Sequence, residues 1–117
     1  MRHQNKGRKL SRERDQRRAF LKILGSNFIL KEKIITTEAR AKELRGFIEK
    51  KITRAKRGDV AAVRQLRKFF PEKVTWKMIK EIAPSLKDRK GGYTRITKIG
   101  PRKNDAAEMV KIELIKK

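Results

Sequence analysis

The residues of this sequence that are best suited to a chemical role are its lysines and arginines, which can bind anions. The chain has 117 residues, of which 35 are Lys or Arg and 13 are Asp or Glu, so its formal charge is +22. Cations at this density repel one another in a compact domain and require counter-charge from a partner. That partner is most commonly the phosphate backbone of a nucleic acid, with an anionic membrane surface or an acidic protein as alternatives. The composition therefore predicts a protein that binds a polyanion.

Residues that could support catalysis or hold a metal are few. The one histidine, His3, has no neighbour in the sequence that would orient it, so a phosphate or backbone contact is its expected role. The absence of cysteine excludes a disulfide framework, a thiolate zinc site and a cysteine nucleophile. No pair of histidines or carboxylates has metal-ligand spacing. We therefore expect no enzymatic activity, no cofactor and no small-molecule substrate.

The first ten residues, MRHQNKGRKL, carry four cationic side chains and no acid. Such a segment cannot bury itself, so residues 1–10 are predicted to form an extended arm ahead of a single α/β domain at residues 11–117. We expect the arm to bind phosphates, against the alternatives of a frayed terminus or an import signal. The arm has no apolar anchor, and no run in the sequence approaches membrane-spanning length, so we expect no membrane partner.

A long helix is predicted from about residue 11 to residue 30, with Ser11 as its N-cap. Its first half is basic, its second half is apolar, and Gly25 falls inside it. We interpret this pattern as a helix whose start points into a polyanion and whose end is anchored in the core. The alternative is a solvated charged face, which acidic residues would normally balance better.

A short strand at residues 34–35 is predicted to turn directly into a second long helix. Thr36 or Thr37 is the candidate N-cap, and apolar residues recur at helical spacing up to a stop at Gly58. Lys51 interrupts this apolar arc, so its side chain must either extend to the edge of the core or face an anion.

Two shorter helices and a hairpin complete the predicted fold. Asp59 is the expected N-cap of a helix ended by Pro71, and another helix begins at Glu72 and is ended by Pro84. Strands at residues 93–99 and 110–114 should form a hairpin with a loop of about eight residues, which the first strand joins. The prediction is an α+β fold, with about four helices packed on a small three-stranded sheet and an extended basic N-terminal arm.

The loop around Gly91 and Gly92 is the candidate for a close approach to phosphate. It lacks the frame of a P-loop or dinucleotide motif, but its backbone N–H groups could reach a phosphate, and Tyr93 could stack on a base or sugar. A plain hairpin turn explains the two glycines equally well. Trp76 and the Phe69–Phe70 pair could also stack on bases, but their helical spacing favours core packing.

The nucleic-acid interpretation has a definite mechanism. Lys and Arg neutralise backbone phosphates and release counterions, so affinity should fall steeply with salt. No helix-turn-helix, zinc finger or aromatic-strand RNA motif is apparent in the sequence, so we expect recognition of RNA shape rather than direct readout of sequence. The candidate contacts lie in the arm, the two long helices and two late loops: Arg2, His3, Lys6, Arg8, Lys9, Arg12, Arg14, Arg17, Arg18, Lys22, Arg40, Arg45, Arg89, Lys90, Tyr93, Arg95, Arg102 and Lys103.

Five blocks of sequence together resemble the bacterial large-subunit ribosomal protein L-seventeen family. They are MRHQNKGRKL at 1–10, TTEARAKELR at 36–45, KRGD at 56–59, DRKGGYTRI at 88–96 and GPRKNDAAEMVKIEL at 100–114. The resemblance implies an α/β structural component of the 50S subunit in the bacterial cytoplasm, which binds 23S rRNA through its basic N-terminal segment. It also implies contacts with neighbouring ribosomal proteins, on the side of the subunit where the nascent-chain exit tunnel opens.

Two other functions are compatible with the charge. A DNA-compacting or regulatory protein outside the ribosome would have a similar excess of cations. A nucleic-acid-cleaving enzyme is the other, and the missing cluster of carboxylates or histidines argues against it.

Overall fold

The computed structural model describes residues 14–115 of the chain. Four helical segments pack on one three-stranded antiparallel sheet, as the sequence predicted. The elements are α1 (Arg14–Lys31), β1 (Lys33–Thr37), α2 (Glu38–Ala55), α3 (Val60–Arg67), α4 (Glu72–Lys77) continued by a π-helical turn η2 (Met78–Ile82) and α5 (Ala83–Ser85), β2 (Thr94–Pro101) and β3 (Glu108–Leu114). The predicted arm and the predicted cap at Ser11 lie outside the described residues.

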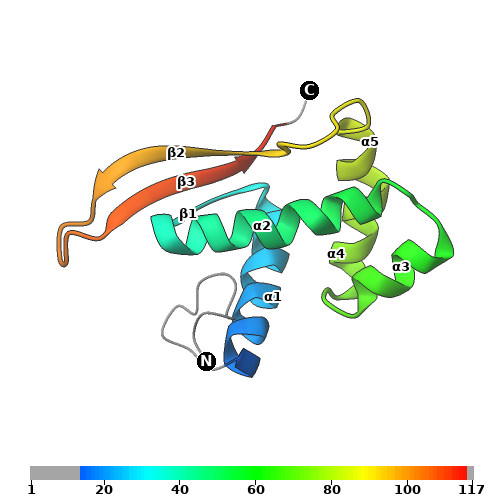
Figure 1. Ribbon diagram of the computed structural model, residues 1–117, viewed down its shortest axis with the longest axis horizontal. Helices are drawn as coiled ribbons and strands as arrows, with labels where there is room; N and C mark the ends of the chain where they lie inside the picture. The colour runs from blue at the N-terminus through cyan, green and yellow to red at the C-terminus, as the bar shows by residue number, and fades with distance from the viewer. Residues whose placement is uncertain (1–13, 116–117) are drawn as a thin grey trace, which may run out of the picture.

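The sheet has the order β1-β3-β2, so the last strand is the central one. The burial of β3 fits this central position. Val110, Ile112 and Leu114 are buried on one face, and the residues between them are half-buried on the other. Ile112 is paired with Ile34 on one side and with Ile96 on the other, so a row of isoleucines crosses the sheet. This inner face lies on α2, and in Figure 1 the opposite face of the sheet is left uncovered.

The junction between β1 and α2 forms as predicted. Thr37 is extended and its hydroxyl accepts a hydrogen bond from the Arg40 N–H at 3.4 Å, which caps α2. The apolar arc of α2, from Ala41 to Ala55, is buried in the core. The chain then leaves the helix at Gly58, whose φ of +66° is a conformation that favours glycine.

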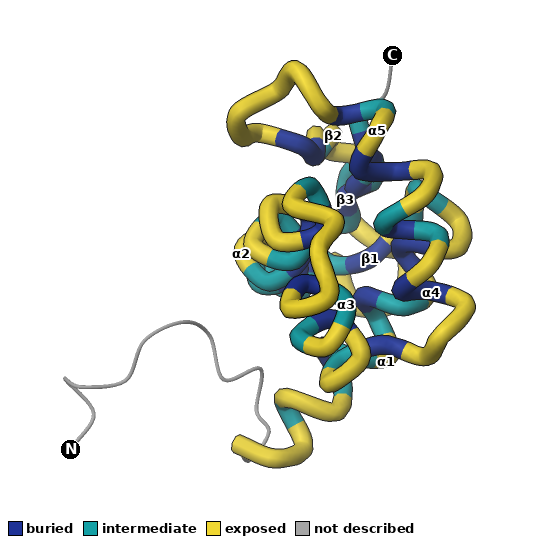
Figure 2. Tube along the Cα trace, turned by 90° about the vertical axis from the view of Figure 1, so that its right-hand side faces the viewer, coloured by how far each residue is buried: buried dark blue, intermediate teal, exposed yellow. Residues whose placement is uncertain are grey.

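Helix α1 runs unbroken through Gly25, and the missing side chain permits a close approach to α2 and to the segment after α3. A Cβ atom at this position would lie 3.2 Å from Cε2 of Phe47 and 3.3 Å from Cε1 of Phe70. The first half of α1 is mostly exposed and its second half enters the core, at Phe28 and Ile29 (Figure 2). The basic half of this helix is therefore the exposed half, and the apolar half is the one that packs in the core.

The last helical segment differs from the prediction at Pro84, which does not end it. The backbone N–H of Ala83 donates to the carbonyl of Met78, one residue further back than in an α-helix. Pro84 then occupies the opening turn of α5, where a missing N–H costs little. The predicted eight-residue loop is also shorter, because the strands extend to Pro101 and from Glu108.

The prediction of core packing holds for Phe70 but is wrong for Trp76. Phe70 is buried, whereas Trp76 remains 39 % exposed with the Lys80 ammonium 5.1 Å from its ring. The inward face of this segment is formed by Val74 and Met78, which flank Trp76 at a spacing of four residues. Trp76 therefore points away from the core on the opposite side of the helix.

Candidate nucleic-acid interface

A groove of about 460 Å³ lies between α1 and α2 and is lined mainly by cations. Six of its side chains are basic and one is acidic. Its floor is apolar and is formed in part by the rings of Phe47 and Phe69. The basic side chains are Arg17, Arg18 and Lys22 from α1 and Lys42, Lys50 and Lys51 from α2, and the acid is Glu43.

Helical spacing assembles the two walls of this groove. Residues four apart share one face of a helix, which places Arg18 and Lys22 together on α1 and Lys42 and Lys50 together on α2. Gly46 lies between the two lysines of α2, and a Cβ atom there would meet nothing within 4 Å. The groove is therefore open at its middle and basic on both sides.

The positive charge of the groove is only partly compensated inside the protein. Arg17 lies 4.0 Å from Glu43, and Lys42 lies 2.9 Å from Glu38. Within residues 14–115, no carboxylate lies within ion-pair distance of the four other cations. Those four are Arg18, Lys22, Lys50 and Lys51.

Lys51 lies over the aromatic floor of the groove. Its Nζ is 3.7 Å from the centroid of the Phe69 ring and 5.2 Å from that of Phe47, distances at which a cation is attracted by the π-face. Burial lowers the pKa of Lys51, and the neighbouring charges of Arg54, Lys50 and Arg18 lower it further. The lysine that interrupts the apolar arc therefore extends to the edge of the core and into a field of like charge.

Tyr93 is a core residue, which corrects the prediction that it could stack on a base. The side chain is 1 % exposed, so no ring face is available to a ligand. Its hydroxyl accepts hydrogen bonds from Thr53 and from the Lys56 ammonium at 3.2 Å and donates to the Lys90 carbonyl at 3.4 Å. Tyr93 thus fixes the loop that precedes it onto α2.

The cations of the loop that Tyr93 holds are accessible to a ligand. Arg89 and Lys90 are exposed, and the Arg89 carbonyl accepts a hydrogen bond from the Lys56 ammonium. Gly92 has a φ of +61°, so a turn requires this glycine whether or not a phosphate approaches it.

Two predicted arginines of the hairpin already have carboxylate partners. The Arg95 guanidinium donates to Glu113 from Nε at 3.1 Å and from Nη2 at 2.7 Å. Arg102 binds Asp105 through two hydrogen bonds of 2.9 and 2.7 Å, and this contact lowers the pKa of Asp105 to about 2. Hydrogen bonding from Arg95 likewise lowers the pKa of Glu113. These arginines supply less uncompensated charge than the cations of the groove.

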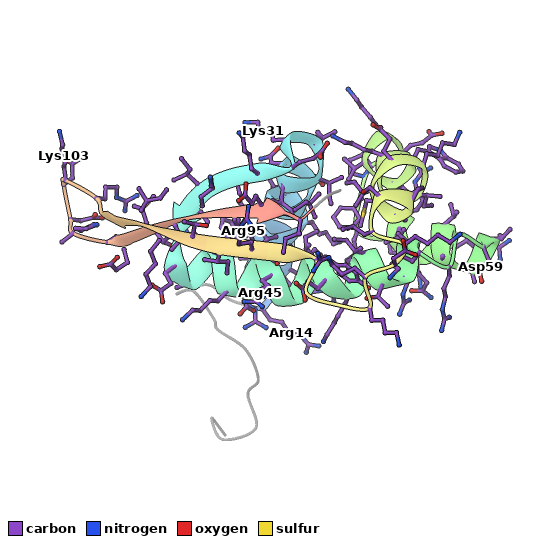
Figure 3. All side chains as sticks on the ribbon, turned by 90° about the horizontal axis from the view of Figure 1, so that it is seen from above. Arg14, Lys31, Arg45, Asp59, Arg95 and Lys103 are labelled. Atoms are coloured by element: carbon purple, nitrogen blue, oxygen red, sulfur yellow. The ribbon has the colours of Figure 1, made fainter. Side chains whose placement is uncertain are left out.

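The predicted contacts do not form one continuous patch. Figure 3 shows Lys103 at the tip of the β2–β3 hairpin, Arg95 on the outer face of the sheet, and Arg14 and Arg45 on another side. Arg45 lies 3.8 Å from Glu49, and the Arg40 guanidinium lies over the ring of Phe20. The predicted residues that lie outside the described part of the chain are Arg2, His3, Lys6, Arg8, Lys9 and Arg12.

Comparison with known proteins places this basic fold in a family. A model of the family described as Ribosomal protein L17 matches residues 20–115. The chain belongs to the ribosomal protein L17 family. Similar proteins include the large ribosomal subunit protein bL17 of Thermoanaerobacter sp. (strain X514), which is 55 % identical over 109 residues, 92 % of this chain and 97 % of the relative. The bL17 protein of Clostridium botulinum (strain Hall / ATCC 3502 / NCTC 13319 / Type A) is 52 % identical over 109 residues, 92 % of this chain and 96 % of the relative.

This member of the L17 family carries basic residues in its groove that sequence reasoning missed. Lys42 and Lys50 were not predicted as contacts, although their spacing around Gly46 marks one face of α2. A second set surrounds the exposed Ile35 at the edge strand β1, in a depression of about 490 Å³. Its cations are Lys31, Lys33 and Lys111. Lys111 reaches this place only through the pairing of β3 with β1, which the sequence alone does not show.

The described residues contain neither a metal-ligand cluster nor a membrane-spanning helix. Across residues 14–115, no group of three or more His, Cys, Asp or Glu side chains is arranged to hold a metal ion. Nor does any helix in this range have the length and apolar character needed to cross a membrane.

Proposed function

We propose that the protein is a structural constituent of the bacterial large ribosomal subunit that binds and braces 23S rRNA. Membership of the ribosomal protein L17 family carries this proposal, and relatives at 52–55 % identity bear the name of a large-subunit protein. Arg18 and Lys22 of α1 support it, because within residues 14–115 they have no ion-pair partner and their charge requires an external anion. The role is non-catalytic, and it is performed in the ribosome in the cytoplasm.

Binding proceeds through charge neutralisation. Each lysine or arginine that contacts a phosphate releases condensed counterions, so the protein would join RNA segments that otherwise repel one another. The exposed start of α1 projects from the core, so its cations can reach a phosphate without disturbing the packing. The contacts are the basic residues of the arm, of α1 and of the exposed loops: Arg2, His3, Lys6, Arg8, Lys9, Arg12, Arg14, Arg17, Arg18, Lys22, Arg89, Lys90 and Lys103.

The proposal includes protein neighbours. We place the chain beside other large-subunit proteins on the side where the exit tunnel opens. Chemical cross-linking of intact subunits tests this position, because lysines on both the hairpin and α2 would give cross-links to proteins of the tunnel exit. Cross-links only to proteins far from the exit would refute the position while leaving the ribosomal role in place.

The decisive experiment compares two partners. We expect the protein to sediment with the 50S particle in a high-salt gradient and to prefer structured 23S rRNA over duplex DNA of equal length in one competition assay. Equal affinity for the two, with sedimentation in the nucleoid fraction, would instead support a DNA-compacting protein. Deleting residues 1–10 should weaken rRNA binding and slow incorporation into the particle, and a deletion without effect would remove the arm from the interface.

A further inference from the structure

The groove between α1 and α2 carries an inference about how RNA is bound, which rests on the proposed function. We infer that this groove is a site for an unpaired RNA segment, in which Lys50 and Lys51 contact backbone phosphates and the Phe69 ring packs against a sugar or base. The two lysines lie on α2, where the charge pattern had suggested only Arg40 and Arg45 as contacts.

The positive charge of the groove indicates that its ligand is a polyanion. The groove has six cations against one carboxylate, and four of the cations have no ion-pair partner within residues 14–115. A bound anion would relieve the repulsion that Lys50, Arg54 and Arg18 exert on the Lys51 ammonium. The groove therefore carries an excess of positive charge, which a bound polyanion would neutralise.

The aromatic floor of the groove favours RNA over an acidic protein as the ligand. Phe69 is only partly buried and the Nζ of Lys51 lies 3.7 Å from its ring centroid, so an aromatic ring and an ammonium meet in one place. Unpaired bases stack on aromatic side chains while their phosphates contact neighbouring cations, an arrangement that an acidic peptide cannot reproduce. The volume of about 460 Å³ lies within the range of ordinary ligand sites. An unpaired nucleotide fits this combination, whereas a continuous duplex presents no free base face.

The test measures salt dependence with matched variants of the full-length chain. The groove variant is Lys50→Met/Lys51→Met, which removes two charges and keeps the stems that cover the aromatic floor. The control is Lys73→Met/Lys80→Met, which removes two charges from exposed lysines outside the groove. Binding to transcribed 23S rRNA is measured between 50 and 200 mM monovalent salt, and folding is checked by circular dichroism.

Loss of two phosphate contacts should reduce the salt slope by about 1.4, at about 0.7 per contact with single-stranded RNA. Over the fourfold change in salt, the wild type should then lose about sevenfold more affinity than the groove variant. The control variant should keep a slope close to that of the wild type. Phe69→Leu should weaken binding by about fivefold or more, because stacking is lost while the charge remains.

The outcomes distinguish failure of the proposed function from failure of the groove site alone. A wild-type protein that does not bind 23S rRNA overturns the proposed function and the groove site together. A wild-type protein that binds, with a groove variant that behaves like the control, overturns the groove site alone. Polyglutamate of matched charge that competes as strongly as single-stranded RNA, and loses affinity with the same variant, would show an acidic protein to be the occupant and would also overturn it.

Discussion

Replacing Gly25 by alanine should destabilise the protein, whereas the same replacement at Gly46 should stabilise it. Both glycines lie in helix interiors, where exchange for alanine gains roughly 0.5–1 kcal/mol from backbone entropy. At Gly46 a Cβ atom meets nothing within 4 Å, so this gain should appear in full. At Gly25 the new atom would lie 3.2 Å from Phe47, 3.3 Å from Phe70 and 3.4 Å from Ile48.

The rings around Gly25 have little room to move. Phe47 and Phe70 contact each other edge to face with centroids 6.0 Å apart, and Phe70 is buried. Overpacking of this kind costs roughly 1–3 kcal/mol, so Gly25→Ala should lose about 1 kcal/mol in net stability. The helix-propensity gain is common to both variants, so the difference between them isolates the packing cost.

Thermal and denaturant unfolding of the two alanine variants, measured beside the wild type, test this reasoning. At about 4–8 °C per kcal/mol for a domain of this size, the melting temperatures of Gly25→Ala and Gly46→Ala should differ by at least about 4 °C. A Gly25→Ala protein as stable as Gly46→Ala would refute the close approach of α1 to the two rings. Equal m-values are required, so that the comparison reports the native state rather than a changed denatured state.

Three further predictions concern the hairpin and its links to α2. Tyr93→Phe should cost about 1 kcal/mol, because the hydroxyl bonds that hold the preceding loop are lost, and hydrogen exchange in that loop should rise. Glu49→Ala should cost about 1–3 kcal/mol in urea unfolding, since its carboxylate accepts from the buried N–H and hydroxyl of Thr94; Glu49→Gln, which keeps an acceptor, should recover most of it. Arg102→Gln should return the pKa of Asp105 from about 2 toward its ordinary value in an NMR titration. Because the folded-state pKa is depressed, this pair stabilises the loop above about pH 4, and the effect is lost as the pH falls toward 2; an unchanged pKa in the variant would exclude Arg102 as the cause.

Local chemistry was sufficient to predict the scaffold. The threonine cap at the β1–α2 junction, the aspartate cap at Asp59 and the alternation of β3 each depend on residues within a few positions of one another. Patterns over such short sequence separations can be recognised from the sequence alone, because N-caps and periodic burial follow from backbone geometry. The helices, the three strands and the membership of the first strand in the sheet were therefore predictable, but not which strand it pairs with.

The roles of particular side chains were less predictable, because distant residues decide them. Tyr93 between glycines and cations has the local pattern of an exposed stacking residue, yet Thr53 on α2 and Lys56 just after it provide the hydrogen bonds that permit its burial. Arg95 has the pattern of a phosphate contact until strand pairing places Glu113 beside it. Charge counting identifies an excess of cations, but only the fold shows which cations are already neutralised.

The core and the candidate interface share residues, among them Phe47, and this makes them dependent on each other. One edge of the Phe47 ring faces the position of Gly25, and the same side chain helps to form the floor of the groove below Lys51. A side chain at Gly25 would press on this ring, which also lines the groove. The missing side chain at Gly25 therefore bears on the basic groove as well as on the core, because the same close packing of α1 on α2 supports the stability of the fold and the shape of the candidate interface.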